Sequence, residues 1–222
     1  MPSLTLNAMK SVTLSFLILL AVALKCGPAQ AAGLEKLTVA GGCFWCVEAD
    51  FEKVDGVQGA VSGFTGGTIA NPTYKQVVRG GTGHYEAVQI TFDPAKVSRE
   101  RLLSLFFRSV DPTDAGGQFC DRGESYRTAI FVSNKAEKTL AEQAKTTAEG
   151  ALGQAIVTPI LEAGAFYPAE AYHQDYYKGS KLVLTRFGPK KQSSAYKAYR
   201  KACGRDARVR QLWGDAAPFA GS

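Results

Sequence analysis

The sequence predicts an α+β fold, a two-layer sandwich with a mixed sheet and a ferredoxin-like (split βαβ) core. Strand-like and helix-like stretches alternate from Leu37 onward, in the order strand, helix, strand and then again strand, helix, strand. No internal repeat and no linker divides the chain after residue 31, and the remainder is long enough to bury one sizeable core. We therefore expect a single domain over residues 32–222, with a less regular tail from about Lys178.

Residues 1–31 are predicted to be a cleaved signal peptide. A short basic start ending at Lys10 precedes the apolar run Ser11–Leu24, and the small residues around Gln30 form a cleavage pattern. The apolar run is too short to cross a bilayer comfortably. Lys25 stands where a lipidated Cys26 would need a small residue, so we do not expect a lipoprotein. We expect a periplasmic or secreted protein without stable membrane insertion after cleavage.

Hydrophobic patterning predicts the strands of the domain. They are Leu37–Ala40, Val57–Phe64, Tyr85–Phe92, Tyr126–Ser133 and Ile156–Leu161. The clearest is Tyr85–Phe92, because its polar and apolar residues alternate as in a half-buried strand. Asp93-Pro94 ends it, and the Gly-rich segment after Phe64 is predicted to be a loop.

Capping residues and helical spacing predict the helices. They are Phe44–Val54, Arg99–Val110, a segment from Asn134 to Glu149, and Pro168–Tyr177. Ser98 is a suitable N-cap for the second helix, in which Leu102, Phe106 and Val110 recur at helical spacing. Asn134 with Glu137 resembles a capping box at the start of the third.

Composition excludes several function classes. The formal net charge is +6, and the basic residues are scattered or in short runs such as Lys190-Lys191. Nothing in this distribution indicates nucleic-acid binding. No second CxxC and no histidine pair at metal spacing is present, so we expect neither a metal site nor a cofactor.

Residues 41–46, Gly-Gly-Cys-Phe-Trp-Cys, are the most informative segment. A strand that ends in Gly41-Gly42 and leads into a helix places Cys43 at the helix N-terminus. The free N–H groups and the dipole there favour an anion, so we expect a lowered pKa for Cys43. Phe44 and Trp45 are predicted to be walls of a small apolar pocket. Cys46, Cys120 and Cys203 are the other cysteines after residue 31, and we favour redox chemistry over two structural bridges.

Several sequence blocks follow one another along the chain: Gly-Cys-Phe-Trp at Cys43, Thr-Gly-Gly at 65–67, Asn-Pro-Thr-Tyr at Tyr74, Gly-His-Tyr-Glu at Glu86, Asp-Arg-Gly at Asp121, and Tyr-Pro-Ala-Glu-Ala-Tyr-His-Gln-Asp-Tyr from Tyr167. In this order they resemble the family of A-type peptide methionine sulfoxide reductases. The similarity extends from about Leu37 to Trp213. One block alone is weak evidence, whereas the ordered series is specific.

The resemblance implies an enzyme that reduces methionine S-sulfoxide, free or in proteins, through a sulfenic acid and an intramolecular disulfide. It implies Cys43 as the nucleophile and Glu86 as the general acid, kept protonated by burial. It also implies a substrate-binding set that comprises Phe44, Trp45, Tyr74, Asp121 and Tyr126. A thioredoxin-like protein is the expected reductant, and we expect a monomer.

The chain departs from the family pattern at its other cysteines. Many members have Gly at the position of Cys46 and use a C-terminal cysteine to resolve the sulfenic acid. Both Cys46 and Cys203 are present here, and we favour Cys46 because it lies one helical turn from Cys43, whereas Cys203 would need a mobile tail. We expect Cys120 to be a bystander near the pocket.

Other polar residues are expected to be structural, and other functions stay open. His84 and His173 are predicted to make structural hydrogen bonds, and Glu48 to be a favourable charge near the start of its helix. The main alternative is a periplasmic CxxC thiol–disulfide oxidoreductase, which would need neither Glu86 nor the two tyrosines. A module that binds oxidised peptides without turnover and a cysteine hydrolase are more distant alternatives.

Overall fold

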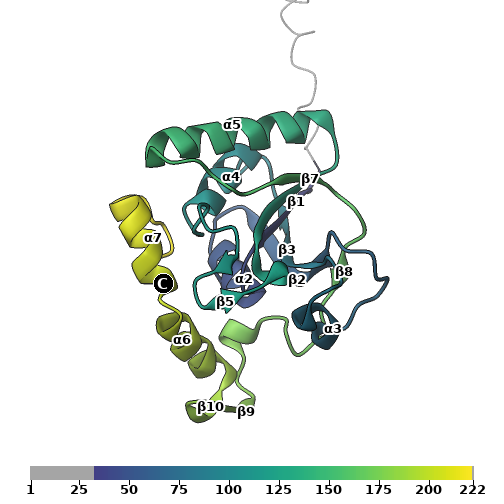
Figure 1. Cartoon of the computed structure of the whole chain (residues 1–222), viewed down its shortest axis with the longest axis vertical. Coiled ribbons are helices and arrows are strands. Elements are labelled where there is room, and N and C mark those ends of the chain that lie inside the picture. Colours follow the sequence, from purple (N-terminus) through teal and green to yellow (C-terminus); the bar gives the residue numbers. More distant parts are fainter. Residues whose placement is uncertain (1–32, 222) are drawn as a thin grey trace, which may run out of the picture. The chain divides into compact units, whose positions relative to one another are not determined.

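A six-stranded mixed sheet runs through the computed structural model, which describes residues 33–221 (Figure 1). The predicted signal peptide lies outside the described residues. The strand order is β7-β6-β1-β3-β2-β8. The bounds are β1 (Glu35–Gly41), β2 (Val57–Thr65), β3 (Tyr85–Phe92), β6 (Thr128–Val132), β7 (Ile160–Glu162) and β8 (Tyr167–Pro168). Only the β6–β7 pair is parallel, and the other neighbours in this sheet are antiparallel.

The four central strands confirm the ferredoxin-like core. Helix α2 (Phe44–Phe51) connects β1 to β2 while β3 lies between these strands. Helix α4 (Arg99–Phe107) lies between β3 and β6 in the chain, and β1 separates those strands in the sheet. Two split βαβ units therefore interlock, as the order of the sequence elements predicts.

The main apolar core lies between one face of this sheet and the helices. Its members include Val39, Ile90 and Ile130 from the strands and Phe51 and Phe106 from α2 and α4, all buried. Helix α5 (Lys135–Leu152) adds its small apolar face to the same core. The opposite sheet face carries a smaller cluster around Ala40, Tyr85 and Phe131. Burial of apolar surface on the helix-covered face is therefore the main favourable term that holds the two layers together.

The predicted caps are confirmed. The Ser98 hydroxyl accepts a hydrogen bond from the N–H of Arg101 at 3.2 Å, at the start of α4. The Asn134 side chain accepts one from the N–H of Glu137 at 2.9 Å, at the start of α5. These side-chain oxygens satisfy N–H groups that have no partner inside the helix. Helices α2 and α4 both end three residues before their predicted ends.

The prediction of a helix over Pro168–Tyr177 is wrong. Tyr167-Pro168 forms the edge strand β8, paired with Gly63 and Phe64 of β2. Turns follow, and only the short 3₁₀ helix η2 (Tyr176–Lys178) forms after Asp175, which has a left-handed φ of 55°. The last predicted strand is also shifted, because the chain joins the sheet only at Ile160.

The C-terminal tail is more regular than predicted. It contains a hairpin of β9 (Leu182–Thr185) and β10 (Gly188–Lys191), helix α6 (Gln192–Ala202), helix α7 (Arg205–Trp213) and the 3₁₀ helix η3 (Gly214–Ala216). Figure 1 shows α6 and α7 in sequence along one side, with the hairpin at the outer end of α6. Patterning misses these helices because the face of α6 that is buried includes Tyr196 and the charged Arg200.

The smaller elements carry loops of the candidate site. They are α3 (Tyr74–Arg79), the two-residue strands β4 (Gly117–Gln118) and β5 (Asp121–Arg122), and the 3₁₀ helix η1 (Glu124–Tyr126). Within residues 33–221, no helix has the length and apolar character needed to cross a membrane.

We expect Asn134→Ala to lower the free energy of unfolding by about 1 kcal/mol, because it removes an N-cap acceptor. Urea unfolding measures this change. Asn134→Asp keeps an acceptor at the same place and should unfold within a few tenths of a kcal/mol of the original protein. Equal losses in both variants would contradict the capping role.

Candidate active site

The turn from β1 into α2 fixes Cys43 at the helix N-terminus, as predicted. Cys43 is the N-cap residue of α2, and its side chain makes no capping hydrogen bond. A Cβ atom on Gly41 would lie 2.9 Å from side-chain atoms of both Val47 and Val110. Gly42 has a φ of +78°, a conformation that favours glycine. The two glycines therefore let the strand turn directly into the helix and leave the thiol of Cys43 available for chemistry.

Glu86 lies in β3 and contacts the same turn. Its side chain is 1% exposed, and its Oε2 accepts a hydrogen bond from the N–H of Phe44 at 3.1 Å. Burial raises the pKa of Glu86 to about 8, and the nearby Asp121 adds to this effect, while the Phe44 N–H and the Tyr126 hydroxyl oppose it. Glu86 is therefore largely protonated at neutral pH, the state that a general acid requires.

Two tyrosine hydroxyls complete the polar side of the site. Tyr74 begins α3 after a capping box at Thr73, and Tyr126 ends η1. The two hydroxyls interact through a hydrogen bond, and both pKa values are raised, first by burial and next by the charge of Glu86. Both groups thus stay protonated and able to donate. Tyr74 is held further by its backbone N–H, which donates to Glu170 Oε1 at 3.2 Å.

Aromatic rings surround Phe44. The ring centroid of Phe44 lies 5.9 Å from Phe64, 6.2 Å from Tyr74 and 5.1 Å from His173. Phe44 is buried in the main core as well as beside the polar cluster, so it is both a core residue and a pocket wall. Trp45 is half-buried and stacks on Tyr176, with centroids 3.8 Å apart. These rings form an apolar, polarizable surface next to Cys43.

The two histidines, His84 and His173, differ in their hydrogen bonding. The predicted structural role of His84 is confirmed. Its Nδ1 accepts a hydrogen bond from the N–H of Gly67 at 3.2 Å, and its Nε2 lies 2.8 Å from the carbonyl oxygen of Ile69. The prediction is wrong for His173, because neither ring nitrogen has a hydrogen-bond partner among the described residues. Burial lowers the pKa of His173 to about 4, so the ring is neutral and joins the aromatic wall.

The prediction of a lowered pKa at Cys43 is wrong. A hydrogen bond with Cys46 raises the pKa of Cys43 most, followed by burial and by the negative charges of Cys46, Glu86 and Asp121. The same hydrogen bond lowers the pKa of Cys46, with help from the guanidinium groups of Arg205 and Arg200. Carboxyl groups thus act on Cys43 and guanidinium groups on Cys46, so the surroundings oppose a thiolate at Cys43 and favour one at Cys46.

Two buried arginines from the tail lie under Cys46 and bind Asp50 of α2. Arg200 Nη1 lies 2.8 Å from Asp50 Oδ1, and Arg205 Nε lies 3.9 Å from Asp50 Oδ2. Arg205 also donates to the carbonyl oxygen of Gly41 at 3.1 Å. The sequence does not point to these residues, because arginines in a basic C-terminal segment are typical of a solvated surface. The only signal was an acidic residue within a short helix that is otherwise mainly apolar.

Glu48 is also buried, contrary to the expectation of a charge beside the helix end. Its carboxyl group accepts hydrogen bonds from the Ser62 hydroxyl and, at 2.5 Å, from the N–H of Asp175. Burial raises its pKa to about 7. Glu48 therefore attaches α2 to β2 and to the segment before η2.

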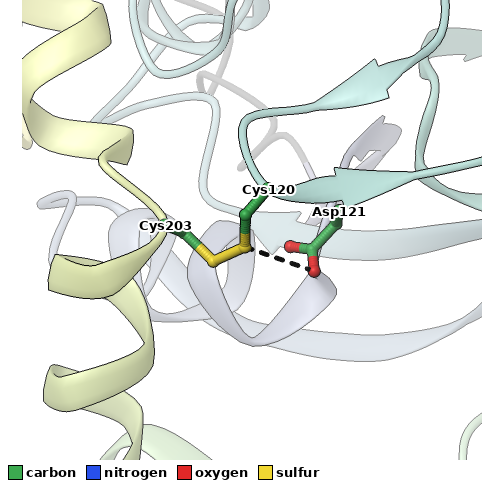
Figure 2. Close-up of a disulfide and its surroundings, with 3 residues drawn as sticks. All are labelled: Cys120, Asp121 and Cys203. Carbon is green, nitrogen blue, oxygen red and sulfur yellow. Dashed lines mark hydrogen bonds between the residues drawn. A yellow bond between two sulfur atoms is a disulfide. The ribbon is translucent and has the colours of Figure 1, made fainter.

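Cys120 and Cys203 form a disulfide with a Cα–Cα distance of 4.8 Å (Figure 2). Cys120 lies in the tight turn between β4 and β5, and Cys203 caps the end of α6. The expectation that Cys120 is a bystander is wrong, and Cys203 is not free to resolve Cys43 in this state. Cys43 and Cys46 are both free thiols. The two partners are 83 residues apart in sequence, so no local signal identified the pair.

A cavity of about 160 Å³ connects these groups. Of the predicted site residues, Cys43, Trp45, Cys46, Asp121 and Cys203 line it. The other predicted residues lie on the polar side of Cys43, where Phe44 and Glu86 are buried and Tyr74 and Tyr126 are half-buried. The structure thus brings all predicted residues to one region, in which the cavity and the cluster meet at Cys43.

Two groups of residues have donor atoms close enough to suggest a metal. In the first, Cys120, Asp121 and Cys203, both sulfur atoms are used in the disulfide. In the second, Glu48, Glu52 and Asp175, the ammonium group of Lys178 lies 2.8 Å from both Glu52 and Asp175. Lys178 already supplies a positive charge to two of these three carboxyl groups, so neither set is a strong candidate for a cation.

A thiol pair at a helix start, beside a buried carboxylic acid and two tyrosine hydroxyls, defines a thiol-dependent oxidoreductase on a ferredoxin-like scaffold. Residues 35–216 match the family model described as peptide methionine sulfoxide reductase. The chain therefore belongs to the peptide methionine sulfoxide reductase family.

Individual relatives agree with this assignment. The chain is 48% identical over 182 residues to a peptide methionine sulfoxide reductase MsrA of Listeria monocytogenes serotype 4a, covering 81% of this chain and 96% of that protein. It is 48% identical over 208 residues to MsrA 2 of Caulobacter vibrioides, covering 93% and 100%. Among solved structures, reduced Mxr1 of Saccharomyces cerevisiae matches with a TM-score of 0.63 and 30% identity, covering 69% of this chain and 88% of that one. MsrA of Corynebacterium diphtheriae matches with a TM-score of 0.59 and 31% identity, covering 67% and 76%.

Because its pKa is raised on folding, Glu86 should make the free energy of unfolding depend on pH. Glu86→Gln should remove this contribution. The unfolded carboxyl group loses its proton near 4.5, whereas the folded one keeps it until about pH 8. Stability from Glu86 is therefore fully present below pH 4.5 and is lost as the pH rises through 8.

Urea unfolding of the original protein and of Glu86→Gln, at pH values from 5 to about 9, measures this contribution. Since all other groups titrate in both proteins, the difference in unfolding free energy should shift in favour of Glu86→Gln with rising pH. Parallel pH curves would contradict the raised pKa.

Proposed function

We propose that this protein reduces methionine S-sulfoxide, free or in oxidised proteins, back to methionine. The observation that carries the proposal is the buried carboxyl group of Glu86, protonated at neutral pH and hydrogen-bonded to the N–H that follows Cys43. A sulfoxide sulfur is a poor electrophile until its oxygen is protonated, so a nucleophile needs such an acid beside it. Family membership and identities of about 48% to named MsrA proteins support the same reaction.

In this proposal, polar and apolar residues of the site bind different parts of the sulfoxide. The Tyr74 and Tyr126 hydroxyls and the Glu86 acid hold the sulfoxide oxygen, and the rings of Phe44 and Trp45 receive the methyl group. Cys43 attacks the sulfoxide sulfur as a thiolate, for which its proton passes to Cys46, whose pKa is lowered. Glu86 gives its proton to the oxygen. Methionine leaves, and Cys43 becomes a sulfenic acid.

Cys46 is the resolving residue in this proposal. It lies one helical turn from Cys43, it is free in the structure, and Arg200 and Arg205 lower its pKa. Its thiolate attacks the sulfenic sulfur, a Cys43–Cys46 disulfide forms, and water leaves. A thioredoxin-like dithiol then supplies two electrons and two protons to restore the thiols. Cys203 is the alternative resolving residue, but its bond to Cys120 removes it from this step.

A general thiol–disulfide oxidoreductase is less favoured. Such an enzyme uses a CxxC pair but has no need of a buried acid and two tyrosine hydroxyls on the other side of the nucleophile. Here the buried Glu86 and the two half-buried tyrosines lie together beside Cys43.

The separated S and R epimers of a blocked methionine sulfoxide, with dithiothreitol as reductant, provide the test. We expect methionine from the S epimer alone, no product with Cys43→Ser, and a loss in kcat/KM of roughly 100- to 10,000-fold with Glu86→Gln, since general acid catalysis has that magnitude. No turnover of either epimer, together with reduction of insulin disulfides, would assign the chain to the alternative.

We also propose export, with cleavage after Ala31, to the periplasm or the exterior. The support is the arrangement of a basic start, an apolar run and small residues before Ala32. Expression of the full chain in a bacterium, followed by N-terminal sequencing of the enzyme from the osmotic-shock fraction, should give Ala32 as the first residue. Intact Met1 in the cytosolic fraction would contradict this.

A further inference from the structure

The cavity of about 160 Å³ is lined by more positive than negative side chains. Its charged lining residues are Asp121, Arg186, Arg200 and Arg205. Arg200 is already neutralised, because its guanidinium group lies 2.8 Å from the carboxyl groups of both Asp50 and Asp206. The cavity wall therefore keeps two further guanidinium groups against one carboxyl group.

Arg205 is a buried guanidinium group that is only partly hydrogen-bonded. Its side chain is 2% exposed, and its Nη1 donates to the carbonyl oxygen of Gly41 at 3.1 Å. Its Nε lies 3.9 Å from Asp50 Oδ2, and its Cζ lies 4.8 Å from the ring centroid of Phe119. Nη2 has no hydrogen-bond partner among the described residues. Since a buried charged donor without a partner is costly, this N–H edge is suited to an anion that enters the cavity.

Arg186, between β9 and β10, brings a second guanidinium group to the same cavity. Its Cζ lies 4.9 Å from the ring centroid of Phe187 and 5.2 Å from that of Tyr199. Arg186 is exposed, and none of the ion pairs in the described part of the chain includes it. Contact with aromatic rings through the face of the group leaves its N–H edge free to bind an anion.

Asp121 compensates these two charges only in part. Burial raises the pKa of Asp121, and Arg205 and then Arg186 counteract this effect, so both arginines act on the same part of the cavity. Neither forms an ion pair with Asp121 among the residues described. Two positive charges against one negative charge leave room for one further anionic group.

The proposed reaction brings one end of the substrate to this cavity. Glu86 and the two tyrosine hydroxyls hold the sulfoxide oxygen, and the rings of Phe44 and Trp45 receive the methyl group. The third substituent of the sulfur leads to the α-carbon, and the cavity that Cys43 and Trp45 line is open to it. Only three carbon atoms separate this sulfur from the carbon of an α-carboxylate, so such a group would still lie within the cavity.

We propose that Arg205 and Arg186 form a subsite for the α-carboxylate of methionine S-sulfoxide, either as the free amino acid or as the last residue of a chain. This inference rests on the proposed function and names a substrate class within it. The forked donors of a guanidinium group match a planar carboxylate, and the burial of Arg205 strengthens the attraction. A methionine sulfoxide inside a chain has a neutral amide at this place and leaves the positive charge without compensation.

Two substrates that differ only at this group provide the test. They are the S-sulfoxides of N-acetylmethionine, which has a free carboxylate, and of N-acetylmethionine methylamide, which has none. With dithiothreitol as reductant, we expect kcat/KM to be roughly 10- to 100-fold higher for the carboxylate, the usual contribution of hydrogen bonds between charged groups. Both values are measured on the same protein, so the fraction of active enzyme cancels in their ratio.

Arg205→Lys and Arg186→Gln should lower this ratio. Arg205→Lys keeps a positive charge near Cys46 and Asp50 but loses the forked donors, and we expect the ratio to fall about 10-fold. Arg186 is exposed, so Arg186→Gln should fold and should lower the ratio about 2- to 5-fold. Arg101→Gln makes the same chemical change at an exposed residue of α4 that does not line the cavity, and it should leave the ratio unchanged.

Free methionine S-sulfoxide distinguishes the two sources of the carboxylate. Its kcat/KM is compared with that of the methylamide in the original protein and in Arg205→Lys. A ratio that falls as it does for N-acetylmethionine sulfoxide would show that the subsite serves the free amino acid and the end of a chain. A fall confined to the acetylated substrate would show that it serves the end of a chain.

The outcomes separate this inference from the proposed function. Equal kcat/KM values for the carboxylate and the methylamide, or higher values for the methylamide, would overturn the subsite and keep the reductase. A preference for the carboxylate that neither arginine variant lowers would also overturn the subsite. Turnover of neither substrate would contradict the proposed function itself.

Discussion

The buried ion pair between Asp50 and Arg200 is the interaction on which the arrangement of the site depends. Asp50 is fully buried in α2, and Arg200 also contacts Asp206 and the hydroxyl of Tyr196 at 2.8 and 2.9 Å. Removing one partner of such a pair leaves a charge without compensation and costs about 3–5 kcal/mol. The pair joins the tail to the helix that carries both reactive thiols. It therefore determines the position of Cys203 and the charge beside Cys46 together.

The opposite electrostatic surroundings of the two thiols suit their successive roles. The hydrogen bond between the thiols raises the pKa of Cys43 and lowers that of Cys46; burial, Glu86 and Asp121 raise the first further, and the arginines lower the second further. The proton that Glu86 holds at neutral pH is then the one delivered to substrate. Once Cys43 has become a sulfenic acid, the arginines favour loss of the proton that Cys46 received, and that proton leaves with the hydroxyl group as water in the resolving step.

Local features of the sequence predicted most of the fold, and interactions between distant segments account for the errors. The caps at Ser98 and Asn134 and the turn at Cys43 depend on neighbouring residues, and all three are confirmed. Helix α6 was missed because Arg200 resembles a surface residue until its partner is known. The pKa of Cys43 was predicted from the helix end alone, whereas the thiol of Cys46 and the carboxyl groups that decide it come from the folded arrangement.

The anchoring of Cys203 argues against the mobile tail that a distant resolving cysteine would require. Arg200 precedes it by three residues and is bound to Asp50, and Arg205 follows it by two and donates to the carbonyl oxygen of Gly41. Between these anchors, Gly204 has a left-handed φ of 72°, which lets α6 turn directly into α7. Disulfide formation requires Cα atoms within about 7 Å of each other, and anchors on both sides keep Cys203 beside the cavity. Cys203 is thus held in place together with the C-terminal helices on either side of it.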